Sequence, residues 1–154
     1  MQKEIVIHYR EYSMEELTEE ERRLMLSAIQ ATDTAYAPYS HFHVGAAVLL
    51  DDGTIVSGSN QENIAYPSGL CAERTALFAA SAQHPGRTMK MIAIVGRDTA
   101  GRLTAASPCG ACRQVMAEQE SRQGEKLSVL CYHSDSKIAI FEDIESLLPF
   151  NFTM

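Results

Sequence analysis

Three cysteines and one glutamate have the types and spacing to hold a metal ion and move a proton. Cys109 and Cys112 form a Cys-x-x-Cys pair, and Cys71 lies upstream with Glu73 two positions after it. Thiolates are good zinc ligands, and three protein ligands leave the fourth tetrahedral position open, as is typical of catalytic zinc. Glu73 need not bind the metal and is placed to act as a general base toward water. The pattern predicts a catalytic zinc site with one ion per subunit.

The spacing of these cysteines is also compatible with two different functions. A Cys-x-x-Cys pair suits a thiol oxidoreductase that uses Cys109 and Cys112. Cys131 could complete a closed four-cysteine site in a non-enzymatic, zinc-stabilised interaction module. However, Cys131 lies in an apolar stretch, where free cysteines are commonly buried and inert. We therefore expect three zinc ligands and one bystander.

Two predicted helices would position the ligands. Helix-forming residues follow Cys71 over 72–80, and a second helix is expected to open after Pro108 and run to Gly124. Cys71 and Cys109 then stand at helix starts, where unpaired backbone N–H groups favour the thiolate. Two facing helix N-termini would present three thiolates to one ion.

Positive charge should be needed near this group. One Zn²⁺ with three thiolates has a net charge of −1, which is a poor environment for generating hydroxide. Arg74 and Arg113 each follow a cysteine or its neighbouring glutamate in these two segments, CAER and CR. We expect them, together with the helix dipoles, to supply the positive charge.

The remaining elements predict a sheet covered by helices. Thr18 and Glu21 form a capping box, and apolar residues recur at helical spacing as far as Tyr36 before Pro38. Five apolar runs predict strands, the first two joined by a tight turn. They cover residues 44–50, 54–58, 91–95, 127–132 and 137–141. We expect an α/β protein, a three-layer α/β/α sandwich with a five-stranded mixed sheet.

Length and charge limit the organisation and the partners. A chain of 154 residues suits a single domain over 1–154, with an N-terminal strand or arm at 1–13 and a catalytic core at 14–152. Within the arm, the β-branched and aromatic run at 4–9 could form an edge strand. The net charge of −7 disfavours a nucleic-acid partner. No apolar run is long enough for a membrane span and no signal peptide is evident, so we expect a soluble, cytoplasmic protein.

Several segments together resemble the small, homotetrameric, zinc-dependent cytidine deaminases. They read CAER at 71–74, PCGACRQ at 108–114, YAPYSHFHVGAA at 36–47, GSNQENIAYP at 58–67 and LLPFNF at 147–152. The resemblance covers about residues 15–152 and implies a homotetramer that deaminates cytidine and 2′-deoxycytidine in pyrimidine salvage. A deaminase of another aminopyrimidine nucleoside, such as a nucleoside antibiotic, is the alternative.

The resemblance also implies residue roles. Cys71, Cys109 and Cys112 would bind zinc, while Glu73 would carry protons from water to N3 of the cytosine ring. Asn60 and Glu62 match ribose-holding residues, Phe42 matches a ring that packs on the base, and Tyr66 and Phe152 match contacts to a neighbouring subunit's pocket. The complete expected substrate-binding set is Phe42, Asn60, Glu62, Asn63, Ala65, Tyr66, Ala72 and Phe152. Arg74 and Gln114 would contact the zinc-binding and catalytic residues, and not the substrate or the metal itself.

Two residues depart from the family's usual pattern. His43 stands where many members of the family have a different, small or polar residue. Gln61 stands between Asn60 and Glu62, where an apolar residue is more common. Neither is expected to be catalytic.

The ribose-binding carboxylate of Glu62 would repel a phosphodiester, which favours a free nucleoside over a polynucleotide.

Overall fold

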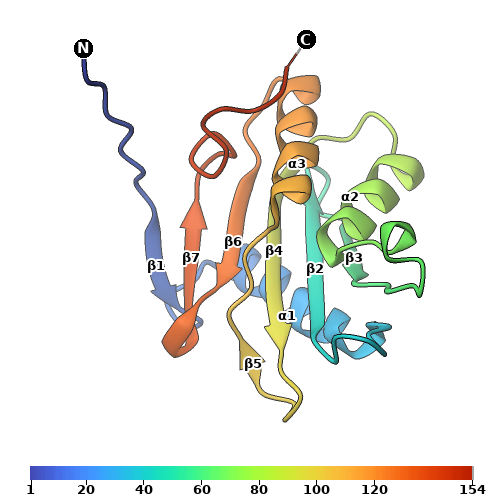
Figure 1. Ribbon diagram of the computed structural model, residues 1–154. Coiled ribbons are helices and arrows are strands. Elements are labelled where there is room, and N and C mark those ends of the chain that lie inside the picture. The colour runs from blue at the N-terminus through green and yellow to red at the C-terminus, as the bar shows by residue number, and fades with distance from the viewer. Residues whose placement is uncertain (154) are drawn as a thin grey trace.

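The computed structural model describes residues 1–153 and contains one mixed sheet (Figure 1). Its strands are β1 (Arg10–Ser13), β2 (His43–Leu50), β3 (Ile55–Ser59), β4 (Met89–Arg97), β5 (Leu103–Thr104), β6 (Ser128–Tyr132) and β7 (Lys137–Phe141). The order across the sheet is β1-β7-β6-β4-β2-β3, and β5 pairs with β4 outside this path. Strands β4 and β6 pair in parallel, whereas β2 is antiparallel to both its neighbours.

Helices cover both faces of this sheet. They are α1 (Glu19–Ala31), α2 (Ala72–Gln83) and α3 (Gly110–Gln123). Helix α1 lies on one face, and α2 and α3 lie side by side on the other (Figure 1). The predicted α/β class with a mixed sheet is confirmed. The predicted strand number was wrong, because β1 and β5 raise it from five to seven.

Alternation along β2 divides the core into two clusters. Ala46 and Val48 pack with α2 and α3, whereas Ala47 and Leu49 pack with α1. Successive side chains of a strand point to opposite faces, so a wholly apolar strand must be covered on both sides. The apolar runs in the sequence therefore correspond to strands at the centre of the sandwich.

Two glycines bring the helices into direct contact with the sheet. A Cβ atom on Gly45 would lie 1.9 Å from the carbonyl oxygen of Ala28 in α1. A Cβ atom on Gly58 would lie 2.5 Å from the backbone nitrogen of Ala76 in α2. Since real Cβ atoms do not approach so closely, any larger residue at Gly58 would push α2 away from the sheet. That helix carries Glu73 and begins next to Cys71.

Helix α1 begins where the capping box predicts and ends earlier than expected. The Thr18 side chain accepts from the Glu21 backbone, and the Glu21 side chain accepts from the Thr18 backbone. The expected continuation to Tyr36 was wrong: α1 stops at Ala31 and a short 3-10 helix, Thr32–Thr34, follows. Tyr36 pairs instead with Gln61, because its backbone bonds the segment after β3.

The N-terminal strand lies later in the chain than residues 4–9. Strand β1 forms at Arg10–Ser13, where β7 offers a partner, with Arg10 opposite Ile140. Residues 1–9 have no strand assignment and leave the body as an extended segment (Figure 1). Tyr9 stacks on Phe141, the last residue of β7, at 5.3 Å between ring centroids. Pairing stops there because β7 ends.

The other predicted turns and helix ends agree with the structure. Gly53 has a φ of 86° in the hairpin turn, and Gly124 has a φ of 71° at the end of α3. Both positions favour glycine because it has no Cβ atom to clash there. Within residues 1–153, no helix has the length and apolar character needed to cross a membrane.

Candidate active site

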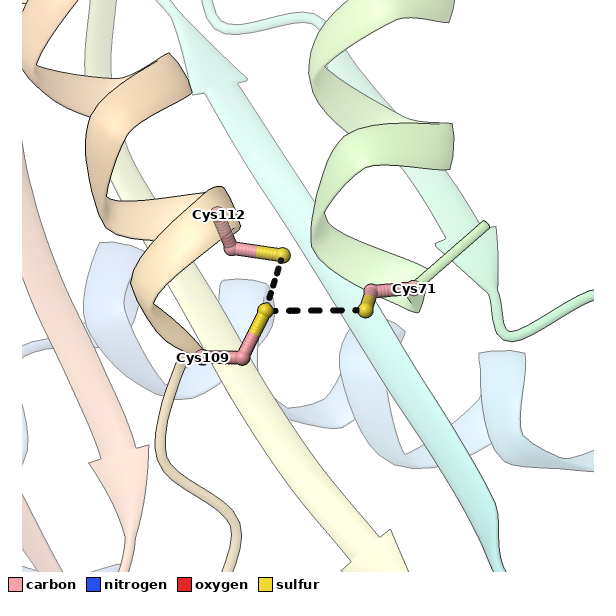
Figure 2. A group of neighbouring side chains, drawn as sticks. All are labelled: Cys71, Cys109 and Cys112. Atoms are coloured by element: carbon pink, nitrogen blue, oxygen red, sulfur yellow. Dashed lines mark hydrogen bonds between the residues drawn. The ribbon is translucent and has the colours of Figure 1, made fainter. Parts of the chain in front are cut away.

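The three predicted zinc ligands meet between the starts of α2 and α3 (Figure 2). Cys71 caps α2 and Cys109 caps α3, with Cys112 one turn into α3. The Sγ atoms of Cys71 and Cys109 are 3.8 Å apart, and those of Cys109 and Cys112 are 3.5 Å apart. All three sulfur atoms lie within 4.8 Å of one another. The sheet thus brings together residues that are distant in the sequence.

This arrangement fits a zinc ion. Zinc–sulfur bonds of about 2.3 Å in tetrahedral geometry require sulfur atoms about 3.8 Å apart, close to the 3.8 and 3.5 Å that separate Cys109 from Cys71 and Cys112. Both helix N-termini also favour negative charge on the sulfur atoms. Hydrogen bonds from Cys112 and Arg74 lower the pKa of Cys71 to about 5, whereas the bond to Cys71 raises the pKa of Cys112. The protein by itself therefore favours one thiolate, at Cys71.

The two arginines expected to supply positive charge have different roles. Arg74 donates from Nη2 to the Sγ atom of Cys71 at 3.4 Å. Arg113 does not contact the thiols in this way: it donates to the carbonyl oxygens of Pro108 at 2.9 Å and Leu147 at 2.7 Å. Arg113 consequently ties the chain before α3 to the C-terminal region. Direct hydrogen bonding to the ligand group falls to Arg74.

Glu73 lies in the first turn of α2 and is only 4% exposed. Burial raises the pKa of Glu73 to about 7, and the negative charge of Cys71 acts in the same direction. Burying a carboxyl group costs free energy, and groups whose pKa is shifted by such burial cluster at catalytic sites. Glu73 is therefore well placed to bind and release a proton next to the ligands.

Cys131 is separate from this group. It lies in β6 and is 2% exposed, and the cluster of possible ligands among residues 1–153 contains Cys71, Cys109 and Cys112 only. Burial raises the pKa of Cys131 to about 12, so it stays a neutral thiol. Its packing matches the expected buried bystander.

A cleft of about 830 Å³ opens above the thiols. Several predicted site residues line it: Phe42, Asn60, Glu62, Asn63, Tyr66, Cys71, Ala72, Glu73, Arg74 and Cys109. Its size is in the range of small-molecule sites. The cleft brings the expected base and ribose contacts next to the expected proton carrier.

Asn60 and Glu62 each bind a backbone segment at the cleft. The Asn60 side chain donates to the Phe42 carbonyl at 2.9 Å and accepts from the Val44 N–H at 2.8 Å. Glu62 Oε1 accepts from the N–H groups of Tyr39 and Ser40 at 3.0 and 3.1 Å. Both side chains are held before any ligand arrives, and each retains unused hydrogen-bonding capacity.

Gly96 makes room for the ring of Phe42. A Cβ atom on Gly96 in β4 would lie 2.6 Å from Cζ of Phe42. The missing side chain therefore lets the ring lie against the sheet at the wall of the cleft. Sequence reasoning selected Phe42 but did not identify Gly96, because the two meet only through strand pairing.

Other predicted residues lie outside the cleft. Ala65 precedes a 3-10 helix, Tyr66–Ser68, and does not line the cleft. Gln114 and Phe152 lie together elsewhere: the Gln114 side chain donates to the Phe152 carbonyl at 2.9 Å and accepts from its N–H at 3.1 Å. Gln114 thus holds the C-terminal segment rather than the thiols. Phe152 is 75% exposed and does not line the cleft of its own chain.

Sequence reasoning missed several residues of the cleft. Tyr39 and Ser40 lie beside Glu62, and the segment 105–107 forms part of the wall. The first two belong to the segment 36–47, so its resemblance to the deaminases pointed to that loop but not to these contacts. The segment 105–107 carries no sequence signal apart from its place before the Cys-x-x-Cys pair.

Comparisons with known proteins agree with this geometry. Residues 18–124 match the model of the "cytidine and deoxycytidylate deaminase zinc-binding region". The chain belongs to this deaminase family. The matched range contains the three clustered cysteines and Glu73, and the family description names zinc as the metal.

Two cytidine deaminase sequences and one cytidine deaminase crystal structure are also similar to this chain. A cytidine deaminase from Halalkalibacterium halodurans is 50% identical over 95 residues, which are 62% of this chain and 68% of that protein. One from Sporosarcina psychrophila is 51% identical over 96 residues, or 62% and 67% of the two chains. The crystal structure of cytidine deaminase from Burkholderia pseudomallei is 39% identical with a TM-score of 0.73, over 88% of this chain and all of that one.

Proposed function

We propose that this protein hydrolyses cytidine and 2′-deoxycytidine to uridine and 2′-deoxyuridine, releasing ammonia. The observation that carries this proposal is the burial of Glu73 beside three clustered thiols at a cleft lined by Phe42 and Glu62. Family membership supports the same reaction. Zinc bound at the three thiols would supply Lewis-acid activation of water.

Glu73 performs the proton transfers in the proposed reaction. It takes a proton from the attacking water and delivers it to N3 of the pyrimidine, which makes C4 more electrophilic, and the water oxygen bonds to C4. The remaining proton on that oxygen then passes through Glu73 to the amino group. The C4–N bond breaks with its electron pair on nitrogen, ammonia leaves and the oxygen stays as the C4 carbonyl. Because Glu73 is only 4% exposed, bulk water does not compete for these protons.

The cleft residues orient the nucleoside. Phe42 offers a ring face for the base, and Asn60 and Glu62 offer an amide and a carboxylate for the ribose hydroxyls. A charged Glu62 at the sugar disfavours a phosphodiester, which supports a free nucleoside as substrate and not a nucleic acid. Asn63 and Ala72 also line the cleft and belong to the proposed binding set, whereas Ala65 lies outside it.

A homotetramer belongs to the proposal. Tyr66 and Phe152 are each 75% exposed in the single chain, which is unusual for large aromatic residues. We propose that both contact a neighbouring subunit's pocket. Light scattering of the purified protein should give the mass of four chains, and a monomer would refute the assembly.

We also propose that residues 1–154 form a single domain, with an N-terminal strand or arm at 1–13 and the catalytic core at 14–152. One sheet joins both core clusters, which supports this division. Limited proteolysis should remove at most residues 1–13 before the core unfolds.

A cytoplasmic location is proposed because thiol ligands persist in a reducing compartment.

Turnover measured by the loss of cytidine absorbance tests the activity. Glu73→Gln should retain about one zinc per subunit and lose activity by at least a factor of about 10²–10⁴. Glu125→Gln is the matched control, because Glu125 is exposed in the loop after α3. A zinc-loaded protein that leaves cytidine unchanged would refute the proposal and direct attention to other aminopyrimidine nucleosides, such as nucleoside antibiotics.

The same protein preparation tests the classes other than deaminase. A thiol oxidoreductase would form a reducible disulfide between Cys109 and Cys112, with substoichiometric zinc. A zinc-stabilised interaction module would lose zinc in Cys131→Ala and be indifferent to Glu73→Gln. We expect neither result, because Cys131 lies outside the ligand group.

A further inference from the structure

The loop before β2 contains a serine whose hydroxyl joins two parts of the proposed nucleoside site. Ser40 Oγ donates to Glu62 Oε2 at 2.5 Å and accepts from the backbone N–H of Phe42 at 3.1 Å. Glu62 and Phe42 both line the cleft, where the proposed function assigns them to the ribose and to the base. The hydroxyl of Ser40 therefore lies between the two groups that hold the two halves of the substrate.

The bonding capacity of the hydroxyl matches this bridge. A serine hydroxyl has one donor hydrogen and two acceptor lone pairs. With its hydrogen committed to a carboxylate, its lone pairs are free to accept from Phe42. Bonds to a charged partner are stronger than neutral ones, so the Glu62 contact fixes the direction of the hydrogen.

The backbone of the loop is shaped to make this bridge. His41, between Ser40 and Phe42, has a φ of 56°, in the left-handed region that non-glycine residues seldom adopt. Its N–H donates to the carbonyl of Ala37 at 3.0 Å, which closes a turn. This turn brings the N–H of Phe42 back toward the side chain of Ser40. Sparsely populated backbone conformations persist where the surrounding contacts hold them.

Two further contacts hold the partners of Ser40 in place. The N–H groups of Tyr39 and Ser40 hold the other carboxylate oxygen of Glu62. The ring of Phe42 fits into the space above Gly96. Ser40 is then the group that connects an anchored carboxylate to an anchored ring.

We propose that Ser40 is a positioning residue that sets the spacing between Glu62 and Phe42 and thereby tunes affinity for the nucleoside. This inference rests on the proposed deaminase function. Ser40 does not act on the reacting atoms, which lie at Glu73 and the thiols. Its loss should affect binding more than the chemical step.

Ser40→Ala tests this role. The variant leaves the N–H of Phe42 without its partner and frees Oε2 of Glu62, while both backbone bonds to Oε1 stay. We expect KM for cytidine to rise about tenfold, as for the loss of one hydrogen bond to a charged group, with kcat within about twofold and zinc content unchanged. Ser40→Thr keeps the hydroxyl and should restore most of the lost affinity.

Two controls separate a local effect from a general one. Ser121→Ala alters an exposed serine of α3 and should leave both KM and kcat unchanged. In a Glu62→Gln background, Ser40→Ala should cause a much smaller further rise in KM, because the two changes remove parts of one unit. Full additivity, a fall in kcat at constant KM, or failure of threonine to rescue would overturn the proposal.

An NMR titration of the Glu62 carboxyl carbon tests the contact without turnover. The Ser40 hydroxyl is the leading cause of the lowered pKa of Glu62, with smaller contributions from the loop N–H groups and His41. The Glu62 pKa should therefore rise in Ser40→Ala and return in Ser40→Thr. An unchanged Glu62 titration would overturn the Ser40 proposal alone, whereas an inactive parent protein with the expected shift would overturn the deaminase function.

Discussion

Replacing Arg74 should weaken zinc binding without unfolding the protein. Arg74 Nη2 donates to Cys71 Sγ at 3.4 Å, and its Nε is buried with no hydrogen-bond partner among residues 1–153. The three thiolates exceed the charge of Zn²⁺ by one, so the guanidinium offsets the surplus negative charge. A glutamine at this position would keep a donor but remove the charge.

The size of the effect follows from this contact. A hydrogen bond to a charged group contributes about 1.5–3 kcal/mol, which corresponds to about 10–100-fold in affinity. Loss of a partner that orients a metal ligand also typically costs about 10–100-fold in metal affinity. Because Arg74 is partly solvent-accessible, we expect Arg74→Gln to lie near the lower end, with zinc bound about tenfold more weakly.

Competition with a chelating indicator dye measures this change directly. Arg102→Gln is the matched control, since Arg102 pairs with Asp98 and its side chain is 80% exposed. Arg74→Lys should fall between the parent and Arg74→Gln, because lysine keeps the charge without the planar fork. An unchanged zinc affinity in Arg74→Gln, or an equal loss in Arg102→Gln, would refute this reasoning.

Further predictions concern packing, the arm and the metal. Gly96→Ala should displace the Phe42 ring and raise KM for cytidine more than it lowers kcat, and equal kinetics would contradict the 2.6 Å approach. Gly58→Ala should destabilise the fold by about 1–3 kcal/mol in urea unfolding, whereas Gly110→Ala, which has open space around its Cβ position, should cost little. Deletion of residues 1–9, which form no strand, should leave cytidine turnover within about twofold in the same assay. Removal of zinc by a chelator should lower Tm and abolish turnover, with both restored by added zinc, because an ion held by the three thiols would join two helix ends.

The α/β class could be predicted because the relevant signals are local. Apolar runs such as 91–95 mark buried strands, and the capping box at Thr18 marks a helix start. The edges were harder to predict. Strand β1 depends on where β7 ends, and the residues at 4–9 have strand propensity but no partner. Propensity alone does not provide the neighbouring strand that a ladder requires.

The chemistry of the thiol site was determined largely by the sequence itself. The Cys-x-x-Cys pair, the helix starts and Glu73 after Cys71 depend on residue type and local backbone, which short-range patterns specify. The separate role of Cys131 followed from its apolar surroundings. For this reason the ligand set could be named before the fold.

Only the tertiary structure decided how these groups are supported. Arg113 and Arg74 look alike in the sequence, since each lies within three residues of a cysteine ligand, yet one binds backbone carbonyls and the other a thiol. Ser40 reaches Glu62, and Gly96 admits the ring of Phe42, through contacts between distant segments. Such contacts depend on strand order and loop path, which arise from packing the whole chain and leave no periodic trace in the sequence.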